Sequence, residues 1–241
     1  MRRIKEIYQY IFYGFLVFLH MITLDQVVAT EQSTVWDKLY INFYGVSTGG
    51  FSLNFYIYLS IVFLGFAYFY QNKLTKMLNE RIYYLLIRER SLYQWFWAHL
   101  KYSLAAVFLL LLALFGLTIG IGWLEGKTFD LELTIESSLS VQKLLVHFFL
   151  NGFLQLVNYL LILFIFTWTL KQSAYVLAVI GGLLLMGSLK IGYLQWFPSG
   201  LNSFGLLETY PALRITGILV CWLLVEILII FYLFRKREII F

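Results

Sequence analysis

Charged residues, cysteine and proline are all scarce in this chain. Only 13% of its 241 residues are charged, about half the share found in ordinary soluble domains. The single cysteine, Cys221, excludes an intrachain disulfide and gives no sign of the redox compartment. There is no low-complexity tract, no internal repeat and no loop long enough for a soluble domain. We therefore expect residues 1–241 to form one domain.

Apolar and aromatic residues take the place of the missing charge. The chain is 61% hydrophobic and 20% aromatic, with a mean hydropathy of +0.79. This composition predicts an all-α polytopic membrane protein. A bilayer core of about 30 Å needs roughly 20 mostly apolar helical residues. Six segments meet that requirement: 8–24, 53–70, 102–124, 144–170, 174–194 and 215–234.

The basic residues predict how these segments are oriented. With the N-terminus in the cytoplasm, 13 of the 18 Lys and Arg residues fall in inside segments and five in outside loops. This bias follows the positive-inside rule and places both termini in the cytoplasm. The net charge of +5 flanks apolar runs instead of clustering on a soluble face. We therefore expect membrane lipid as a partner and no nucleic acid.

The largest cytoplasmic segment, 71–101, contains most of the stretch "ERIYYLLIRERSLYQWFWAHLKYS". Leucines and tyrosines alternate with basic residues in its first part, which favours a helix at the membrane surface. Ser91 and Gln94 have the spacing of a capping box, so a helix should begin there and continue into the third span. Trp95 and Trp97 would then lie at headgroup depth. The segment fits either an ordinary positive-inside loop or a docking element for a cytoplasmic partner.

The six spans and the charged segment before the third span resemble permease subunits of ABC-2 type ABC transporters. The pattern is closest to short permeases found with peptide-antibiotic export or immunity systems of Gram-positive bacteria. The resemblance covers the whole chain in topology and residues 80–101 in sequence pattern. In that family the corresponding inside helix is the coupling helix, which docks on a separate ATP-hydrolysing subunit. The resemblance thus implies a docking segment that comprises Arg81, Arg88, Glu89, Arg90, Ser91 and Trp95.

The same resemblance implies a function. The chain would be a transport subunit of a bacterial plasma membrane that exports or expels a hydrophobic or amphipathic peptide. Two permeases, identical or paralogous, would form the pathway, and ATP and magnesium would bind to the partner ATPase subunit. The alternative is an energy-independent membrane immunity protein that binds a bacteriocin or lantibiotic and needs no ATPase.

We expect no catalysis, metal binding or nucleotide binding by the chain itself. The stretch "GIGWLEGKTF" imitates the phosphate-binding pattern G-x-x-x-x-G-K-[ST], but Ile121 occupies the position of the first glycine. No H-E-x-x-H or G-x-S-x-G motif is present. His147 has no second His or Cys at ligand spacing near it.

Polar residues recur along the fourth predicted span. They follow one another at intervals of four, four, four and three, as Lys143, His147, Asn151, Gln155 and Asn158. This spacing places them on one helix face, which should avoid lipid. Hydrogen bonds between helices and a substrate-lining surface are the two interpretations.

Glu226 is the only acid deep inside a predicted span. An intramembrane carboxylate is costly, and its presence needs a reason. We expect either structural pairing, with His147, Lys190 or a hydroxyl group, or a role in transport or proton coupling.

Two weaker patterns complete the sequence. Gly116 and Gly120 form a G-x-x-x-G pair, for which we favour packing inside the bundle over a contact between two copies. Residues 128–138, "TFDLELTIESS", alternate apolar and polar side chains, which predicts a short strand or extended segment with an acidic edge. That edge is either a solvated loop or an attractor for a cationic peptide.

Overall fold

A computed structural model describes residues 2–27, 34–44, 53–78, 91–135, 139–170, 173–188, 196 and 211–236. Within these ranges the chain is helical apart from short connecting stretches, and they contain no strand, only one isolated bridge between Thr34 and Thr128. The all-α prediction is confirmed for these residues.

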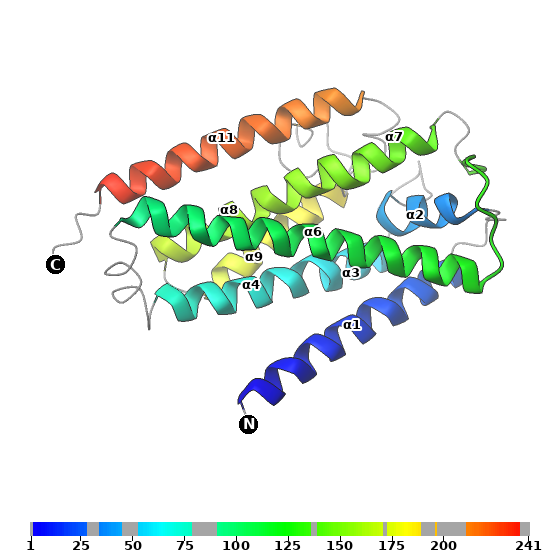
Figure 1. The fold of residues 1–241 in the computed structure, drawn as a ribbon, viewed down its shortest axis with the longest axis horizontal. Coiled ribbons are helices and arrows are strands. Elements are labelled where there is room, and N and C mark those ends of the chain that lie inside the picture. The colour runs from blue at the N-terminus through cyan, green and yellow to red at the C-terminus, as the bar shows by residue number, and fades with distance from the viewer. Residues whose placement is uncertain are drawn as a thin grey trace.

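The helices follow one another from the N-terminus in the order shown in Figure 1. Two of the long continuous helices contain a π-helical turn, η1 or η3, in which the backbone is locally widened. The elements are α1 (Arg2–Val27), α2 (Val35–Tyr44), α3 (Leu53–Leu59), η1 (Ser60–Leu64), α4 (Gly65–Lys76), α6 (Leu92–Leu124), α7 (Val141–Val146), η3 (His147–Asn151), α8 (Gly152–Leu170), α9 (Ser173–Ser188) and α11 (Ala212–Lys236).

Four of the continuous helices are long and apolar enough to cross a membrane. They comprise Leu53–Lys76, Leu92–Leu124, Val141–Leu170 and Ala212–Arg235. The other two predicted spans coincide with α1, whose apolar part covers Tyr8–Thr23, and with α9, which has 16 residues. The structure therefore supports a multi-pass membrane protein with four spans by length and composition.

The long helices form a bundle with two distinct ends (Figure 1). At one end, which we call the Ser91 end, Tyr93 of α6 packs on Phe234 of α11, and His99 of α6 packs on Tyr70 of α4. The other end, which we call the α2 end, holds α2 and the residues after α6. The start of α1 and the end of α11 both lie toward the Ser91 end.

Close helix contacts occur at two glycines. A Cβ atom on Gly65 would collide with the ring of Tyr13 in α1, and one on Gly122 would lie 3.2 Å from Val35 of α2. The predicted pair, Gly116 and Gly120, lies elsewhere on α6, and a Cβ on either residue meets nothing within 4 Å. In the part of the chain that the structure describes, no other helix therefore comes into close contact with this pair.

Helix α2 was not predicted from the sequence. It has only 10 residues, but Leu39, Ile41 and Phe43 are all 0–1% exposed. Phe43 contacts Tyr58 of α3 and Phe148 of η3, and Val35 contacts Gly122 of α6. The helix is thus enclosed by three other elements of the bundle.

Of the segment 128–138, predicted to be a short strand or extended, residues 128–135 are described, and they form no strand, only the bridge at Thr128. Leu133 is buried at 7% exposure, whereas Leu131 is 75% exposed and Phe129 is 51% exposed. The alternating apolar side chains therefore do not share one buried face. The segment is irregular because its backbone contacts go to α2, where Val35 N donates to Thr128 O over 3.0 Å.

Candidate functional site

The polar residues of the fourth predicted span form one buried seam. His147 and Asn151 lie on η3, Gln155 and Asn158 lie on α8, and all four are 0% exposed. Lys143, one turn earlier on α7, is only half-buried. Four of the five residues predicted to share a face are thus buried inside the bundle, and Lys143 is not. We call His147, Asn151, Gln155 and Asn158 the polar seam.

Hydrogen bonds join the polar seam to α11. Thr216 Oγ1 donates to Asn151 Oδ1 over 2.6 Å, and Asn151 Nδ2 lies 3.3 Å from the carbonyl oxygen of Ala212. About two turns after Asn151, Asn158 Nδ2 of α8 donates to the carbonyl oxygen of Leu219 over 3.2 Å. This geometry agrees with the interpretation that the seam holds helices together.

Hydrogen bonds within the continuous helix that comprises η3 and α8 complete the polar seam. His147 Nδ1 and Asn151 Nδ2 are 2.8 Å apart, and Gln155 Nε2 donates to the hydroxyl oxygen of Tyr159 over 2.6 Å. His147 and Asn151 are the first and last residues of the π-helical turn η3. The interface between α8 and α11 is the most extensive in the bundle.

Glu226 lies further along the same α11 face. It is 2% exposed, and neither carboxylate oxygen has a hydrogen-bond partner among the residues that the structure describes. Of its predicted partners, His147 bonds to Asn151 instead, and Lys190 lies outside the described ranges. Structural pairing of Glu226 is therefore not seen in the described part of the bundle.

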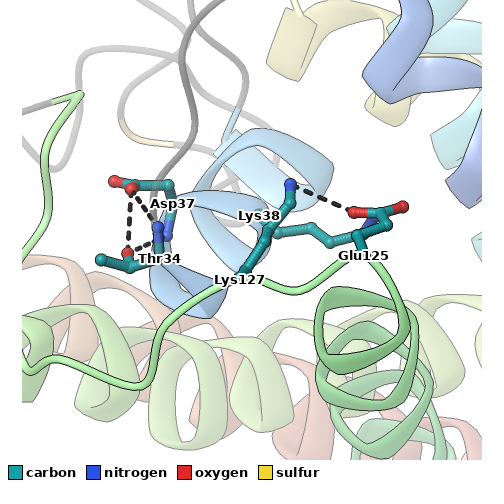
Figure 2. A network of polar contacts seen from close by, with 5 residues as sticks. All are labelled: Thr34, Asp37, Lys38, Glu125 and Lys127. Carbon is teal, nitrogen blue, oxygen red and sulfur yellow. Dashed lines mark hydrogen bonds and ion pairs between the residues drawn. The ribbon is translucent and has the colours of Figure 1, made fainter.

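A second polar cluster fastens α2 to the residues after α6 (Figure 2). Thr34 Oγ1 accepts from Asp37 N over 3.2 Å, and the Asp37 carboxylate accepts from Thr34 N over 3.1 Å. These reciprocal bonds form a capping box at the start of α2. We call the cluster the α2 clasp; it comprises Thr34, Asp37, Lys38, Glu125, Lys127 and Thr134.

Asp37 is the centre of the α2 clasp. Besides the two donors of Thr34, its carboxylate accepts from Thr134 N at 2.8 Å, Thr134 Oγ1 at 2.7 Å and Ile135 N at 3.3 Å. Burial raises the pKa of this carboxyl, but the hydrogen bonds from Thr134, Thr34 and Ile135 outweigh burial, so the pKa lies below its usual value. The carboxylate thus ties α2 to residues almost a hundred positions later in the chain.

Lys38 supplies the other half of the α2 clasp. Its side chain is 0% exposed, and its Nζ lies 2.7 and 2.8 Å from the two carboxylate oxygens of Glu125, which is 32% exposed. Lys127 Nζ lies 3.2 Å from the same carboxylate. Burial raises the pKa of Glu125, but hydrogen bonding and charge from Lys38 and Lys127 lower it below its usual value.

No family model, no curated protein and no solved structure matches this chain. Its function is therefore argued from its own residues. Among the described residues there is also no group of three or more His, Cys, Asp or Glu that could hold a metal ion.

The sequence that imitates a phosphate-binding loop is a helix end. Gly126 has a φ of 75°, Gly126 N donates to Trp123 O over 3.0 Å, and Lys127 N donates to Gly122 O over 3.1 Å. These two bonds and the left-handed glycine define a Schellman motif, which closes α6. The lysine side chain pairs with Glu125 and belongs to the α2 clasp.

Only part of the predicted docking segment is described. Arg81, Arg88, Glu89 and Arg90 lie outside the described ranges. Ser91 is the N-cap of α6, with its Oγ accepting from Tyr93 N over 3.2 Å, as the capping pattern predicted.

The two tryptophans that follow have different environments. Trp97 is 44% exposed, whereas Trp95 is 3% exposed and packs on His99 and Phe164. Side chains two positions apart on a helix point to nearly opposite sides. Trp95 is thus buried inside the bundle, where it packs α6 against Phe164 of α8.

The α2 clasp was not predicted from the sequence. The signal was present as "TVWD", a threonine followed three residues later by a carboxylate before an apolar run, which is a capping pattern. Its long-range half, from Asp37 to Thr134 and from Lys38 to Glu125, leaves no local pattern in the sequence.

The pH dependence of stability at acid pH tests the role of the Asp37 carboxylate. Because the pKa values of Asp37 and Glu125 are lowered by folding, their ionised forms stabilise the folded clasp above the unfolded values of about 4. This contribution to stability is lost only as the pH falls through the lower pKa values that the two carboxyl groups have in the folded protein. We expect the difference in Tm between wild type and Asp37→Asn to be constant from about pH 8 to 5 and to narrow below about pH 4. A difference that already narrows between pH 8 and 5 would assign the effect to another group.

Removing the charge of Glu125 should weaken the α2 end. In Glu125→Gln the buried Lys38 ammonium loses its carboxylate, which we expect to cost about 1 to 3 kcal/mol of unfolding free energy. The estimate is below that for a fully buried pair because Glu125 is 32% exposed. Chemical denaturation in detergent measures it, with Glu132→Gln as the control because Glu132 is an exposed acid of the same segment. Equal effects of the two changes would contradict a special role for Glu125.

Proposed function

We propose that this chain is the membrane permease subunit of an ABC transporter of the ABC-2 type. In this proposal it has six spans with both termini in the cytoplasm of a bacterium, and the Ser91 end faces the cytoplasm. A separate ATPase subunit drives it, and a second permease copy or a paralogue completes the pathway. The cargo is a hydrophobic or amphipathic peptide that is exported or expelled.

The continuity of α6 is the observation that carries this proposal. The helix has 33 residues without interruption, which corresponds to about 50 Å, well beyond the roughly 30 Å of a bilayer core. It begins at the capped Ser91, directly after the charged segment, and ends at Glu125 and the α2 clasp. A displacement at the Ser91 end therefore reaches the α2 end along one rigid element.

The Ser91 end of α6 is also well fastened to the rest of the bundle. Phe96 contacts Phe164 of α8 and Phe234 of α11 at centroid distances of 5.3 and 5.9 Å. Tyr93 contacts Phe234 as well, at 5.6 Å. Because α8 carries part of the polar seam and α11 is hydrogen bonded to it, motion of α6 would be passed to the helices around the buried polar groups. A charged segment that served only as a positive-inside loop would require no such connection.

The exposed acids at the α2 end support the choice of cargo. Asp130 and Glu132 are both exposed on the segment after α6, and the clasp holds this segment in place through Thr134. Such acids attract a cationic amphipathic peptide at long range, and salt screens this attraction. An energy-independent immunity protein would use the same acids but would not need the continuous α6.

Affinity purification tests the proposal. The tagged chain would be extracted from its native membranes in mild detergent, and co-purified proteins would be identified by mass spectrometry. We expect a soluble ATP-hydrolysing subunit in near-equal amount. Recovery of the chain alone, or of the chain with a bound peptide and no ATPase subunit, would contradict the permease and favour the energy-independent immunity protein.

A further inference from the structure

Glu226 occupies an unusual place on α11. The residues of this face that are buried at 0–4% exposure follow one another at intervals of four, seven, four and four, as Ile215, Leu219, Glu226, Ile230 and Phe234. At Leu219 the face contacts the polar seam through Asn158, and at Phe234 it contacts Phe164 and Trp168 of α8. Glu226 lies between a hydrogen-bonded contact and an aromatic contact, both made with α8.

The described neighbours of α11 provide no cation for this carboxylate. In η3 and α8 the only titratable side chains are His147 and Tyr159, which bond to Asn151 and Gln155. In α6, His99 is within 3.1 Å of the Tyr70 hydroxyl of α4. The remaining titratable groups of α6 are exposed on its surface, at Tyr93, Lys101 and Tyr102.

The charged residues of α11 itself lie near its two ends. Arg214 is in the first turn and lies 5.6 Å from the ring centroid of Trp196, and Arg235 and Lys236 are the last two residues of the helix. Cys221 and Tyr232 are exposed. In the described part of the chain, therefore, none of these groups is hydrogen bonded to the Glu226 carboxylate.

An ionised carboxylate in such a place is costly. Removing it from water without a partner costs several kcal/mol in a protein interior, whereas a neutral carboxylic acid loses far less. The group nevertheless lies on the buried face of α11, between two positions at which this face contacts α8. The missing partner is a cation, and the smallest cation that reaches a closed interior is the proton.

We propose that Glu226 is a proton-binding site and carries its proton while the α8–α11 interface is closed. This inference goes beyond the proposed transport function and does not depend on it, because it follows from the burial of the carboxyl group. The proton is supplied by water, and no redox partner or cofactor takes part.

A lipid-soluble carbodiimide is a direct probe of such a group. Dicyclohexylcarbodiimide takes the acid proton on one nitrogen while a carboxyl oxygen bonds to its central carbon. The acyl group then migrates to the nitrogen, and a stable N-acylurea forms without a leaving group. The reagent requires the protonated acid and reaches it through the membrane. A water-soluble carbodiimide has the same chemistry but does not partition into the bundle.

The experiment treats the full-length protein in native membranes with each reagent and locates the adduct by peptide mass spectrometry. We expect Glu226 to be modified at least about tenfold more by the lipid-soluble reagent than by the water-soluble one. A difference of about 1.4 kcal/mol between the free energies with which the two reagents enter the bundle is sufficient for this factor of ten. Asp130, which is exposed, should show the opposite preference. The wild-type protein suffices for this result, so it does not depend on whether a variant folds.

Two outcomes would overturn the proposal. Absence of an adduct at Glu226 would mean that the carboxyl is ionised and paired with a cation, for example Lys190, and equal modification by both reagents would mean that water reaches it. Infrared spectroscopy gives a second readout: the carbonyl stretch of a protonated carboxyl should be present in wild type and absent in Glu226→Gln. A spectrum without that band in wild type would also contradict the assignment.

Discussion

Reversal of Arg88 and Arg90 to glutamate is expected to lower recovery of the ATPase subunit with the tagged chain by at least about tenfold. Like charges would then face each other where the docking segment meets its partner, and desolvated like charges cost several kcal/mol. The chain itself should insert in normal amount because its apolar spans are untouched. Quantitative mass spectrometry of the purified complex measures the ratio of the two subunits.

The matched control carries the same change of charge on either side of the docking segment. Lys73 of α4 and Lys101 of α6 are both exposed cations toward the Ser91 end, and we would reverse both to glutamate. This control should leave recovery of the ATPase subunit within about twofold of wild type, since rim charges contribute little to affinity. An equal loss in the control would assign the effect to the general charge of this surface and not to Arg88 and Arg90.

Replacement of Asp37 by alanine should have the largest effect on stability. Two donors of Thr34, two of Thr134 and one of Ile135 lose their acceptor, and the cap of α2 is lost as well. We expect a loss of about 2 to 4 kcal/mol in unfolding free energy, because buried donors without partners cost about 1 to 3 kcal/mol each and partly find water. Thermal unfolding of the purified protein in detergent measures the change.

Asp130→Ala is the control for this prediction. Asp130 lies in the same segment but is exposed, so its replacement should change the unfolding free energy by less than about 0.5 kcal/mol. Proteolysis of residues 129–135 gives a second measurement, because release of Thr134 should make the segment easier to cleave in Asp37→Ala only. Equal stability of the two variants would contradict the central role of Asp37 in the clasp.

Periodic features could be predicted from the sequence. The spacing from His147 to Asn158 was sufficient to place four polar residues on one buried face, because helical periodicity is local and lipid excludes polar groups. The start of α6 at Ser91 was also predicted, since a capping hydroxyl acts on the next few backbone N–H groups. In both cases the physical cause lies within a few residues of the pattern.

Features that depend on distant contacts could not be predicted in this way. Helix α2 is too short for its apolar residues to indicate a span, and the orientation of the predicted spans placed its charged residues Asp37 and Lys38 in an outside loop. Both are 0% exposed because their partners come from residues 125–135. Close contacts at glycine are of the same kind, because they depend on which helix lies opposite: among the described residues they occur at Gly65 and Gly122 and not at Gly116.

Site-specific photocross-linking in native membranes tests the central claim most directly. A photoreactive amino acid would replace Arg90 in one variant and Trp123, an exposed residue near the other end of α6, in a second variant. The account predicts a cross-link from position 90 to a peptide of the ATPase subunit and none from position 123. Absence of that cross-link at position 90, or equal cross-linking from both positions, would contradict docking at the Ser91 end of α6.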